Sequence, residues 1–387
     1  MTSKKIYFDN AATTKVDEKV LKSMIPYFTE KYGNASSQHL MGTEAKVVLE
    51  DSRKKIAGKL NCKKDEIVFT SGGTEGNNMI LKGLWNYQVE NKTGKNHIVT
   101  TKIEHDCILK TCKWLEKQGC DVTYLDVDSE GFINLEDLEN AITKKTFLVS
   151  IIHANNEIGT IQDLEKIGRI CYEKKVLFHT DACQSFTKIP IDVKKLNLDF
   201  ATINSHKIHG PKGVGAVFIK NDLKEKVIPL FHGGGHEYNL RSGTENVSGI
   251  VGFAKAVDLV NKKDILKMEK LRDKLIEGLL NIDGVKLNGP GINGKRLCNN
   301  INVTFDNVEG EAVGGYLESY GIMTSAGSAC RSHTGEPSHV LKSIGLTEKQ
   351  SDSSLRISIS KYTTEKEVDY FLKKIKEIVR KLSRFNW

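Results

Sequence analysis

Residues 198–213 read LDFATINSHKIHGPKG, and this stretch places a single lysine, Lys207, directly after an apolar run. The run from Leu198 to Ile203 is short and apolar, which predicts a buried strand, and the Gly-Pro pair at 210–211 marks a break soon afterwards. Lysines usually lie on wet helical faces, whereas this one is expected to emerge where a buried strand ends. Lys207 is therefore a candidate for chemistry.

Similar runs recur between about residue 65 and residue 220, separated by helical patterns. They are EIVFT (66–70), NHIVTT (96–101), DVTYLDV (121–127), TFLVSIIHA (146–154), VLFHTDA (176–182), DFATIN (199–204) and GAVFIK (215–220). This alternation predicts an α/β fold in which a mostly parallel sheet is flanked by helices on both faces. Ligands of such sheets bind at the carboxyl ends of the strands.

The pattern changes after residue 252. Residues 254–280 form a charged amphipathic stretch with apolar residues at helical spacing, which predicts a helix. Apolar runs at 299–305, 321–330 and 354–360 then interleave with helical segments, up to a terminal helix from Glu365, as in a smaller α+β domain. We expect a large domain at 15–254 and a small domain made of 1–14 and 255–387, with a mobile loop at about 325–337.

The composition is that of a soluble globular protein. The 387 residues are 39% hydrophobic and 27% charged, and no apolar run approaches the roughly 18 residues of a membrane span. The start lacks the apolar core of a signal peptide, and the eight cysteines form no CxxC pair, so we expect a cytoplasmic protein with reduced thiols. The net charge of +8 comes without an aromatic-interleaved basic motif, which argues against direct nucleic-acid binding.

Small residues follow the run that ends at Thr70. The segment SGGTEGNN (71–78) opens a predicted helix, and the N–H groups at a helix N-terminus can bind a phosphate. A plain helix start with Thr74 as the N-cap residue is an alternative interpretation. The segment matches neither GxGxxG nor a P-loop, which disfavours a nicotinamide or ATP site.

Polar residues also follow three other runs. Glu104 and His105 come after 96–101, Asn156 comes after 146–154, and Asp181 and Gln184 close the run at 176–182. An acid in such a place is usually a helix cap or a metal ligand. No further oxygen or imidazole ligands adjoin Asp181 at tight spacing, so we expect no metal.

A phosphate-binding turn, an imidazole, an amide, an acid and a strand-end lysine together suit one cofactor. Pyridoxal 5′-phosphate needs a lysine for its Schiff base, an acid that keeps its ring nitrogen protonated, and a helix N-terminus for its phosphate. The sequence therefore predicts a pyridoxal phosphate site around Lys207.

The same segments resemble those of a known family. The chain resembles the cysteine desulfurases, fold-type I pyridoxal phosphate enzymes of the class V aminotransferase group, nearly from end to end. The matching segments are FDNAATT (8–14), YGNASS (32–37), TSGGTEGNN (70–78), EHDCIL (104–109), HANNEIGTIQD (153–163), HTDACQS (179–185), SHKIHGPKGVGA (205–216), HGGGHEYNLRSGTENV (232–247) and SAGSAC (325–330). Nine segments in the same order make this resemblance highly specific.

The resemblance implies a set of cofactor contacts. Lys207 would carry the cofactor, Asp181 would partner its ring nitrogen, and His105 would lie against the ring face. The ring hydroxyl region would be bound by Asn156 and Gln184, and the phosphate by Gly73, Thr74, Ser205 and His206. Asn204 stands beside Ser205, and which of the two touches the phosphate is open.

The resemblance also implies a homodimer. Thr244, after the glycine run at 233–235, would reach the phosphate in the other subunit, so each site would be incomplete alone.

For the substrate, L-cysteine, the resemblance implies Arg356 as the carboxylate clamp, with Asn34 nearby. Cys330 lies among small and polar residues and would be the thiol that takes sulfur from the substrate as a persulfide, leaving alanine. The long segment around it resembles the longer-loop subgroup that serves iron-sulfur assembly. The sulfur would then pass to an acceptor, for which an iron-sulfur scaffold, a transfer-RNA thiolation enzyme and a cofactor-biosynthesis protein all stay open.

Three other functions are weighed against this one. A selenocysteine lyase or an aminotransferase would keep the cofactor and dispense with Cys330. A non-enzymatic scaffold would not need both Lys207 and Asp181. A sugar-nucleotide or nicotinamide protein could share the sheet, because a fold does not determine a function.

Overall fold

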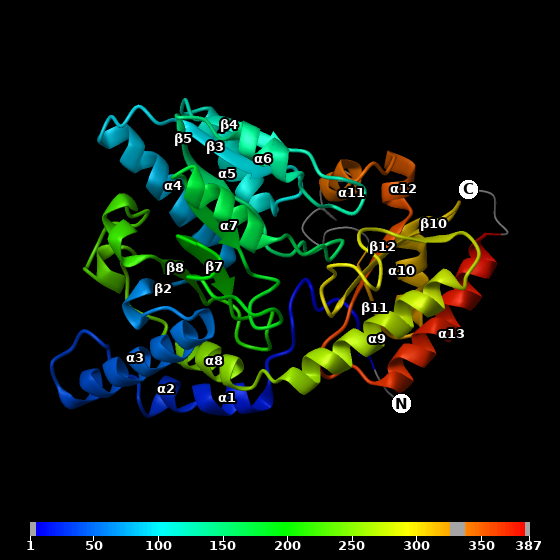
Figure 1. Ribbon diagram of the computed structural model, residues 1–387. Coiled ribbons are helices and arrows are strands. Elements are labelled where there is room, and N and C mark those ends of the chain that lie inside the picture. Colours follow the sequence, from blue (N-terminus) through cyan, green and yellow to red (C-terminus); the bar gives the residue numbers. More distant parts are fainter. Residues whose placement is uncertain (1–4, 326–336, 384–387) are drawn as a thin grey trace.

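The computed structural model describes residues 5–325 and 337–383 (Figure 1). Cys330 and most of the predicted loop at 325–337 lie outside the described residues. Within them, no helix is both long and apolar enough to cross a membrane.

The larger sheet has seven strands in the order β2-β8-β7-β6-β5-β3-β4. β8 runs in the opposite direction to the other six strands, and all pairs without β8 are parallel, so the predicted mostly parallel α/β sheet is confirmed. The strands, in chain order, are β2 (Ile67–Thr70), β3 (His97–Thr101), β4 (Asp121–Leu125), β5 (Thr146–Ser150), β6 (Leu177–Asp181), β7 (Phe200–Asn204) and β8 (Gly215–Ile219). Each lies within a predicted run. The central strands are buried along their whole length, as strands covered on both faces are.

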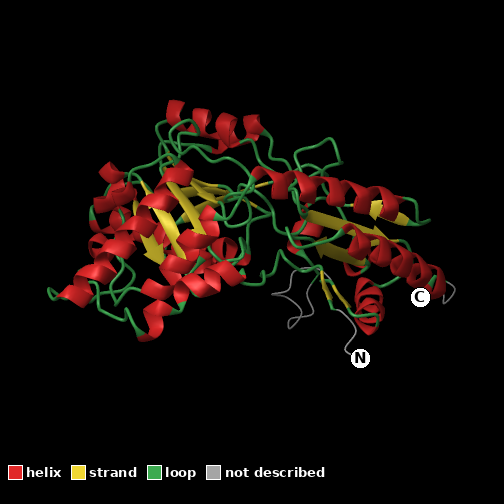
Figure 2. Cartoon of the chain, turned by 90° about the horizontal axis from the view of Figure 1, so that it is seen from below, coloured by secondary structure: helices red, strands yellow, loops and turns green. Residues whose placement is uncertain are grey.

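Helices cover both faces of this sheet (Figure 2). One hydrophobic core joins a face of the sheet to α3, α7 and α8, through residues such as Ile56, Ile167 and Phe253. A second core joins the other face to α4 and α5, through Leu84 and Ile108. The helices are α1 (Glu18–Met24), α2 (Pro26–Thr29), α3 (Leu40–Leu60), α4 (Gly73–Glu90), α5 (Asp106–Glu116), α6 (Leu135–Ala141), α7 (Leu164–Glu173) and α8 (Val247–Asp258).

A separate core forms around a three-stranded antiparallel sheet of order β12-β10-β9, on the side of the molecule where both chain ends lie (Figures 1 and 2). Leu275, Ile301 and Phe371 are fully buried in it. Its strands are β9 (Val285–Leu287), β10 (Asn300–Phe305) and β12 (Ser354–Ser358), and β1 (Ile6–Tyr7) pairs in parallel with β11 (Ile322–Met323) beside them. Its helices are α9 (Lys262–Leu280), α10 (Gly310–Ser319), α11 (His339–Ser343), α12 (Glu348–Asp352) and α13 (Glu365–Leu382).

The prediction of one continuous helix over residues 254–280 is wrong, because the structure has two helices there. α8 ends at Asp258, and α9 begins at Lys262 after Asn261, whose side chain accepts a hydrogen bond from the backbone N–H of Asp264 at 3.0 Å. Asparagine is a strong N-cap residue, so it starts a new helix inside a continuous amphipathic pattern. α8 packs into the core of the large sheet and α9 into the smaller core. The division into 15–254, and 1–14 with 255–387, stays a prediction.

Residues 6–14, which we call the N-terminal strap, run from the smaller sheet to the end of β7. The strap pairs with β11 through Ile6, and the backbone N–H of Asn10 donates to the carbonyl of Ser358 in β12 at 3.1 Å. At its far end, the backbone N–H of Thr14 donates to the carbonyl of His206 at 3.0 Å. The strap therefore connects the smaller core, to which Ile6 and Phe8 belong, with the end of β7.

An ion pair fixes the segment that leads to Thr244. Glu237 accepts bonds of 2.7 Å from both terminal nitrogens of Arg53 on α3, and both side chains are 3% exposed. Residues 237–239 all have positive φ angles, a costly conformation for residues other than glycine. Breaking such a buried pair by removing one partner costs about 3 to 5 kcal/mol, because the other charge is left buried and unpaired.

Candidate active site

A cavity of about 280 Å³ lies where the carboxyl ends of β6 and β7 meet the N-termini of α4 and α5. This is the edge at which a parallel sheet binds its ligands. Residues from six of the matched segments line it, among them Gly73, Thr74, His105, Asn156, Asp181, Gln184, His206 and Lys207, and Arg356 lines it as well.

Lys207 points into this cavity just beyond the end of β7. Its amine donates to the carbonyl oxygens of Ala11 and Ala12 in the strap, the second at 2.6 Å. Burial, and after it the positive charge of Arg356, lowers the pKa of the Lys207 amine to about 8. A larger share of this amine is thus neutral near pH 7 than for a surface lysine, and only a neutral amine is a nucleophile.

Asp181 ends β6 and is 5% exposed. One carboxylate oxygen accepts from the side-chain amide of Asn77 on α4 at 2.7 Å, and the other accepts from the backbone N–H of Cys183 at 2.9 Å. Donors to both oxygens hold this carboxylate in one orientation at the cavity wall.

The N-terminus of α4 lies open at the cavity. The residue before the helix is Gly72, which has no side chain to cap the helix, and Thr74 is the second helical residue, so the N-cap interpretation of Thr74 is wrong. A Cβ atom at Gly73 would meet the Cys183 sulfur at 2.6 Å, so only glycine brings the backbone this close. The free N–H groups and the helix dipole make this an anion site.

Asn204 and Ser205 differ in position. Asn204, the last residue of β7, lines the cavity, whereas Ser205 is fully buried and does not line it. The side-chain oxygens of both residues are buried and have no hydrogen-bond partner among the described residues. The phosphate contact predicted for Ser205 stays a prediction.

His206 lines the cavity beside Lys207. Its Nδ1 atom lies 3.1 Å from the hydroxyl oxygen of Thr13. Burial, and after it the charge of Lys207, lowers the pKa of His206 to about 3. His206 is therefore neutral at physiological pH, and it can donate one hydrogen bond without adding charge.

His105 is the N-cap residue of α5, and its Nδ1 atom accepts the backbone N–H of Cys107 at 3.2 Å. The preceding residue, Glu104, is fully buried, and burial raises its pKa to about 8. One oxygen of Glu104 accepts from the Thr101 hydroxyl and from the backbone N–H of Ile152, both at 2.8 Å. Glu104 therefore joins the ends of β3 and β5 and fixes the start of α5.

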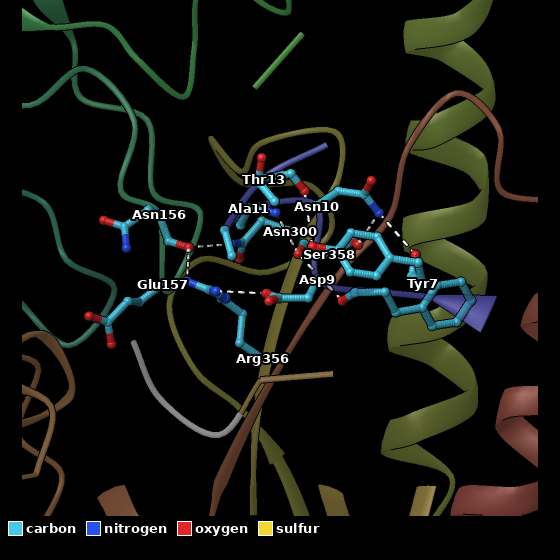
Figure 3. A network of polar contacts seen from close by, with 12 residues as sticks. Tyr7, Asp9, Asn10, Ala11, Thr13, Asn156, Glu157, Asn300, Arg356 and Ser358 are labelled. Carbon is cyan, nitrogen blue, oxygen red and sulfur yellow. Dashed lines mark hydrogen bonds and ion pairs between the residues drawn. The ribbon is translucent and has the colours of Figure 1, made fainter. Parts of the chain in front are cut away.

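Arg356 brings a guanidinium from β12 into the cavity wall and is 2% exposed (Figure 3). It donates to a carboxylate oxygen of Asp9 at 2.8 Å and to the carbonyl of Asn156 at 3.3 Å. That carbonyl also accepts from the side chain of Asn300 on β10 at 3.0 Å. The Nε atom of Arg356 is buried and has no hydrogen-bond partner among the described residues. Asp9 and Asn156 thus orient the guanidinium from one side, and Arg356 lines the cavity, where a guanidinium can meet an anion.

Gln184 contacts the strap at the same carbonyl as Lys207. The side-chain amide of Gln184 donates to the carbonyl of Ala11 at 2.9 Å, the same carbonyl that accepts from Lys207. The strap backbone thereby sets the position of two predicted cofactor-binding side chains.

Besides Ser205, two predicted residues, Asn34 and Thr244, do not line this cavity. Asn34 lies on an exposed segment, where its side chain accepts the backbone N–H of Ser36 at 2.9 Å. Thr244 is exposed and does not line the cavity of its own chain. Cys330 lies outside the described residues. The predicted roles of these residues stay predictions.

The segment that contains Cys330 begins and ends at the cavity wall. Ser325 and Arg356 exchange two backbone hydrogen bonds, of 3.2 and 2.7 Å. On the other side, the Ser338 hydroxyl donates to the carboxylate of Glu157, a cavity-lining residue, at 2.5 Å. Cys330 follows Ser325 by five positions, so an extended chain spans at most about 17 Å between them.

Several cavity residues could not be assigned from the sequence. Ala11 and Ala12 contribute backbone carbonyls, and His339, on α11, lines the cavity while its Nε2 atom lies 2.8 Å from the carbonyl of Glu104. Cys107 lines the cavity and Asn77 lies behind it. Both of these sit inside matched segments, 104–109 and 70–78, but only the fold shows which of their neighbours they touch.

Known proteins resemble this chain over nearly its whole length. The family model described as Aminotransferase class-V matches residues 6–371. A protein named cysteine desulfurase IscS, from Clostridium botulinum, is 46% identical over 382 residues, which cover 98% of this chain and 95% of the relative. A solved structure named NifS-like protein superposes with a TM-score of 0.90 at 44% identity, covering 98% of this chain and 100% of that one. A structure described as SspA in complex with cysteine has a TM-score of 0.83 at 38% identity, covering 93% and 100%.

The lowered pKa of Lys207 predicts how this amine reacts in protein freed of any cofactor. Because only the neutral amine reacts with trinitrobenzenesulfonate, labelling of Lys207 should rise with pH and reach half its maximum near pH 8. Labelling of surface lysines should reach half its maximum at about pH 10.4. Peptide mass spectrometry at a series of pH values measures both, with K207R as the control that loses the early label. A Lys207 midpoint equal to that of the surface lysines would contradict this assignment.

Proposed function

The chain belongs to the class-V aminotransferase family and is a homologue of the cysteine desulfurases, and we propose that it converts L-cysteine to L-alanine while Cys330 takes the sulfur. The observation that carries this proposal is the meeting of Lys207, Asp181 and Arg356 in one cavity, beside both ends of the segment that contains Cys330.

The cavity fits pyridoxal 5′-phosphate. The open N-terminus of α4 at Gly73, with Thr74 and His206, would hold the phosphate, and Asn204 lines the same cavity. Lys207 would hold the cofactor covalently, and Asp181 would hold a proton on its ring nitrogen. When bound, the cofactor supplies an electron sink that stabilises the negative charge left on the substrate after a proton departs.

Lys207 is also the proposed base. Its amine has a pKa of about 8 and belongs to a residue that lines the cavity, so it can take a proton from the α carbon and return it. Asn156 and Gln184, at the wall, are proposed to contact the ring hydroxyl region. His105, which would lie against the ring, is proposed to hold or deliver a second proton.

Arg356 is proposed to bind the substrate carboxylate. Its guanidinium is buried, oriented by Asp9, and part of the cavity lining. A guanidinium recognises a carboxylate through paired hydrogen bonds, which a lysine ammonium could not reproduce. Asn34 lies apart from this cavity, and its role near the carboxylate stays a prediction.

The sulfur step balances without an external oxidant. The Cys330 thiolate attacks the substrate sulfur, a sulfur–sulfur bond forms, and the carbon–sulfur bond breaks. The electron pair of the broken bond stays with the substrate carbon, which collects a proton to become the methyl group of alanine. Cysteine and one thiol thus become alanine and one persulfide, which we propose passes to an acceptor protein such as an iron-sulfur scaffold.

Substitution of Cys330 tests the proposal. C330A should keep its bound cofactor and its yellow colour, but alanine release from excess L-cysteine should fall by about 100-fold or more, since the sulfur loses its attacking nucleophile. C62A is the matched control, because Cys62 is half-buried, bonded to a backbone carbonyl, and outside the cavity. Undiminished alanine release by C330A would instead favour a lyase that does not need this thiol.

We propose that the protein acts as a homodimer. Thr244 is exposed and does not line the cavity of its own chain, as expected if it serves the other subunit. Large apolar side chains gather on the exposed faces of α1, α2 and α3 and the segments between them, which lie together in Figure 1. These are Leu21, Ile25, Phe28, Tyr32, Leu40 and Val47. Apolar surface of this kind marks an interface, and a second copy is the occupant we propose.

Mixed dimers test the role of Thr244. If Thr244 completes the partner's site, K207A and T244A homodimers should both be weak, each for its own reason. A dimer that pairs one K207A chain with one T244A chain contains one complete site and should recover about half of the wild-type activity. Differently tagged chains, co-expressed and purified through both tags, allow this assay. A mixed dimer no more active than the T244A homodimer would show that Thr244 serves its own chain.

A further inference from the structure

Four side chains around the cavity form one hydrogen-bonded chain. Asn77 donates to the Asp181 carboxylate at 2.7 Å and to the Cys107 sulfur at 3.1 Å, and that sulfur lies 3.1 Å from the Nδ1 atom of His105. The proposed partner of the ring nitrogen is thereby connected to the imidazole proposed to lie against the ring.

The direction of each bond follows from its chemistry. A carboxylate accepts, so the Asn77 group that faces Asp181 must be the NH₂ group. That group has two hydrogens, and the second is directed to the sulfur of Cys107. The sulfur therefore acts as an acceptor toward Asn77 and keeps its own S–H to donate.

His105 can receive that hydrogen only in one tautomer. The backbone N–H of Cys107 donates to Nδ1 of His105 as the cap of α5, and a backbone N–H cannot accept. Nδ1 is thus an acceptor without a hydrogen of its own, and the proton of the neutral ring lies on Nε2. The S–H of the Cys107 side chain donates to the same lone pair of Nδ1, so this nitrogen accepts two hydrogen bonds from Cys107.

We propose that Cys107 is a positioning residue that acts through His105: its thiol donates to Nδ1, fixes the ring plane, and keeps the transferable proton on Nε2. This inference rests on the proposed function, because the proton on Nε2 matters only if His105 works on a bound substrate. In this role Cys107 donates its S–H, in contrast with the thiolate proposed for Cys330.

The infrared S–H stretch tests the bond itself. In the holoenzyme, the difference spectrum between wild type and C107A isolates the Cys107 band, and the difference against C107S must give the same band. We expect it at lower frequency than the band isolated with C62A, because Cys62 donates to a carbonyl at the longer distance of 3.6 Å. An absent band, or one at or above the Cys62 frequency, would overturn the proposal.

Kinetics test the consequence. C107A should lower kcat for alanine formation by about 10-fold with KM for L-cysteine changed less than about 2-fold, because the proton carrier loses its alignment while Arg356 still binds the substrate. C107S, whose hydroxyl can accept and donate in the same way, should retain more than half of the wild-type kcat. Equal loss in C107A and C107S, or no loss in C107A, would contradict a positioning role.

The two readouts separate this inference from the proposed function. A wild-type protein that binds the cofactor but forms no alanine would refute the desulfurase proposal, and the infrared band would still decide whether the thiol bonds to His105. Normal alanine formation with no shifted band would refute the thiol bond alone.

Discussion

The structure depends on one placement: a lysine amine buried at the end of β7 and held by two backbone carbonyls of the N-terminal strap. Taking an ammonium out of water is unfavourable, and the neighbouring charge of Arg356 adds to the effect, so the pKa of Lys207 falls to about 8. Ala11 and Ala12 keep the side chain directed into the cavity. A neutral, directed amine at this position is what covalent attachment to an aldehyde requires.

The strap explains how two separate cores make one site. The same short segment pairs with β11, orients Arg356 through Asp9, and accepts from Gln184 and Lys207 through Ala11 (Figure 3). The cofactor lysine and the substrate clamp are thereby fixed relative to each other, although they come from different sheets. Arg356 also bonds through its backbone to Ser325, which sets where the segment containing Cys330 begins.

Sequence reasoning identified those site residues that directly follow a buried strand, such as Asp181 and Lys207, because a parallel sheet brings strand ends together. The family resemblance is also confirmed. The break at Asn261 was missed because the apolar pattern continues through it. The links made by Asn77 and Cys107 could not be predicted, since both residues lie inside helices and their partners come from other elements.

The account depends most directly on which side chain holds the cofactor. Purified protein loaded with pyridoxal 5′-phosphate can be reduced with borohydride, which makes the covalent link permanent, and then digested and analysed by mass spectrometry. The account predicts that the added mass lies on the peptide containing Lys207 and that K207A carries none. An adduct on any other lysine, or wild-type protein that takes up no cofactor, would contradict it.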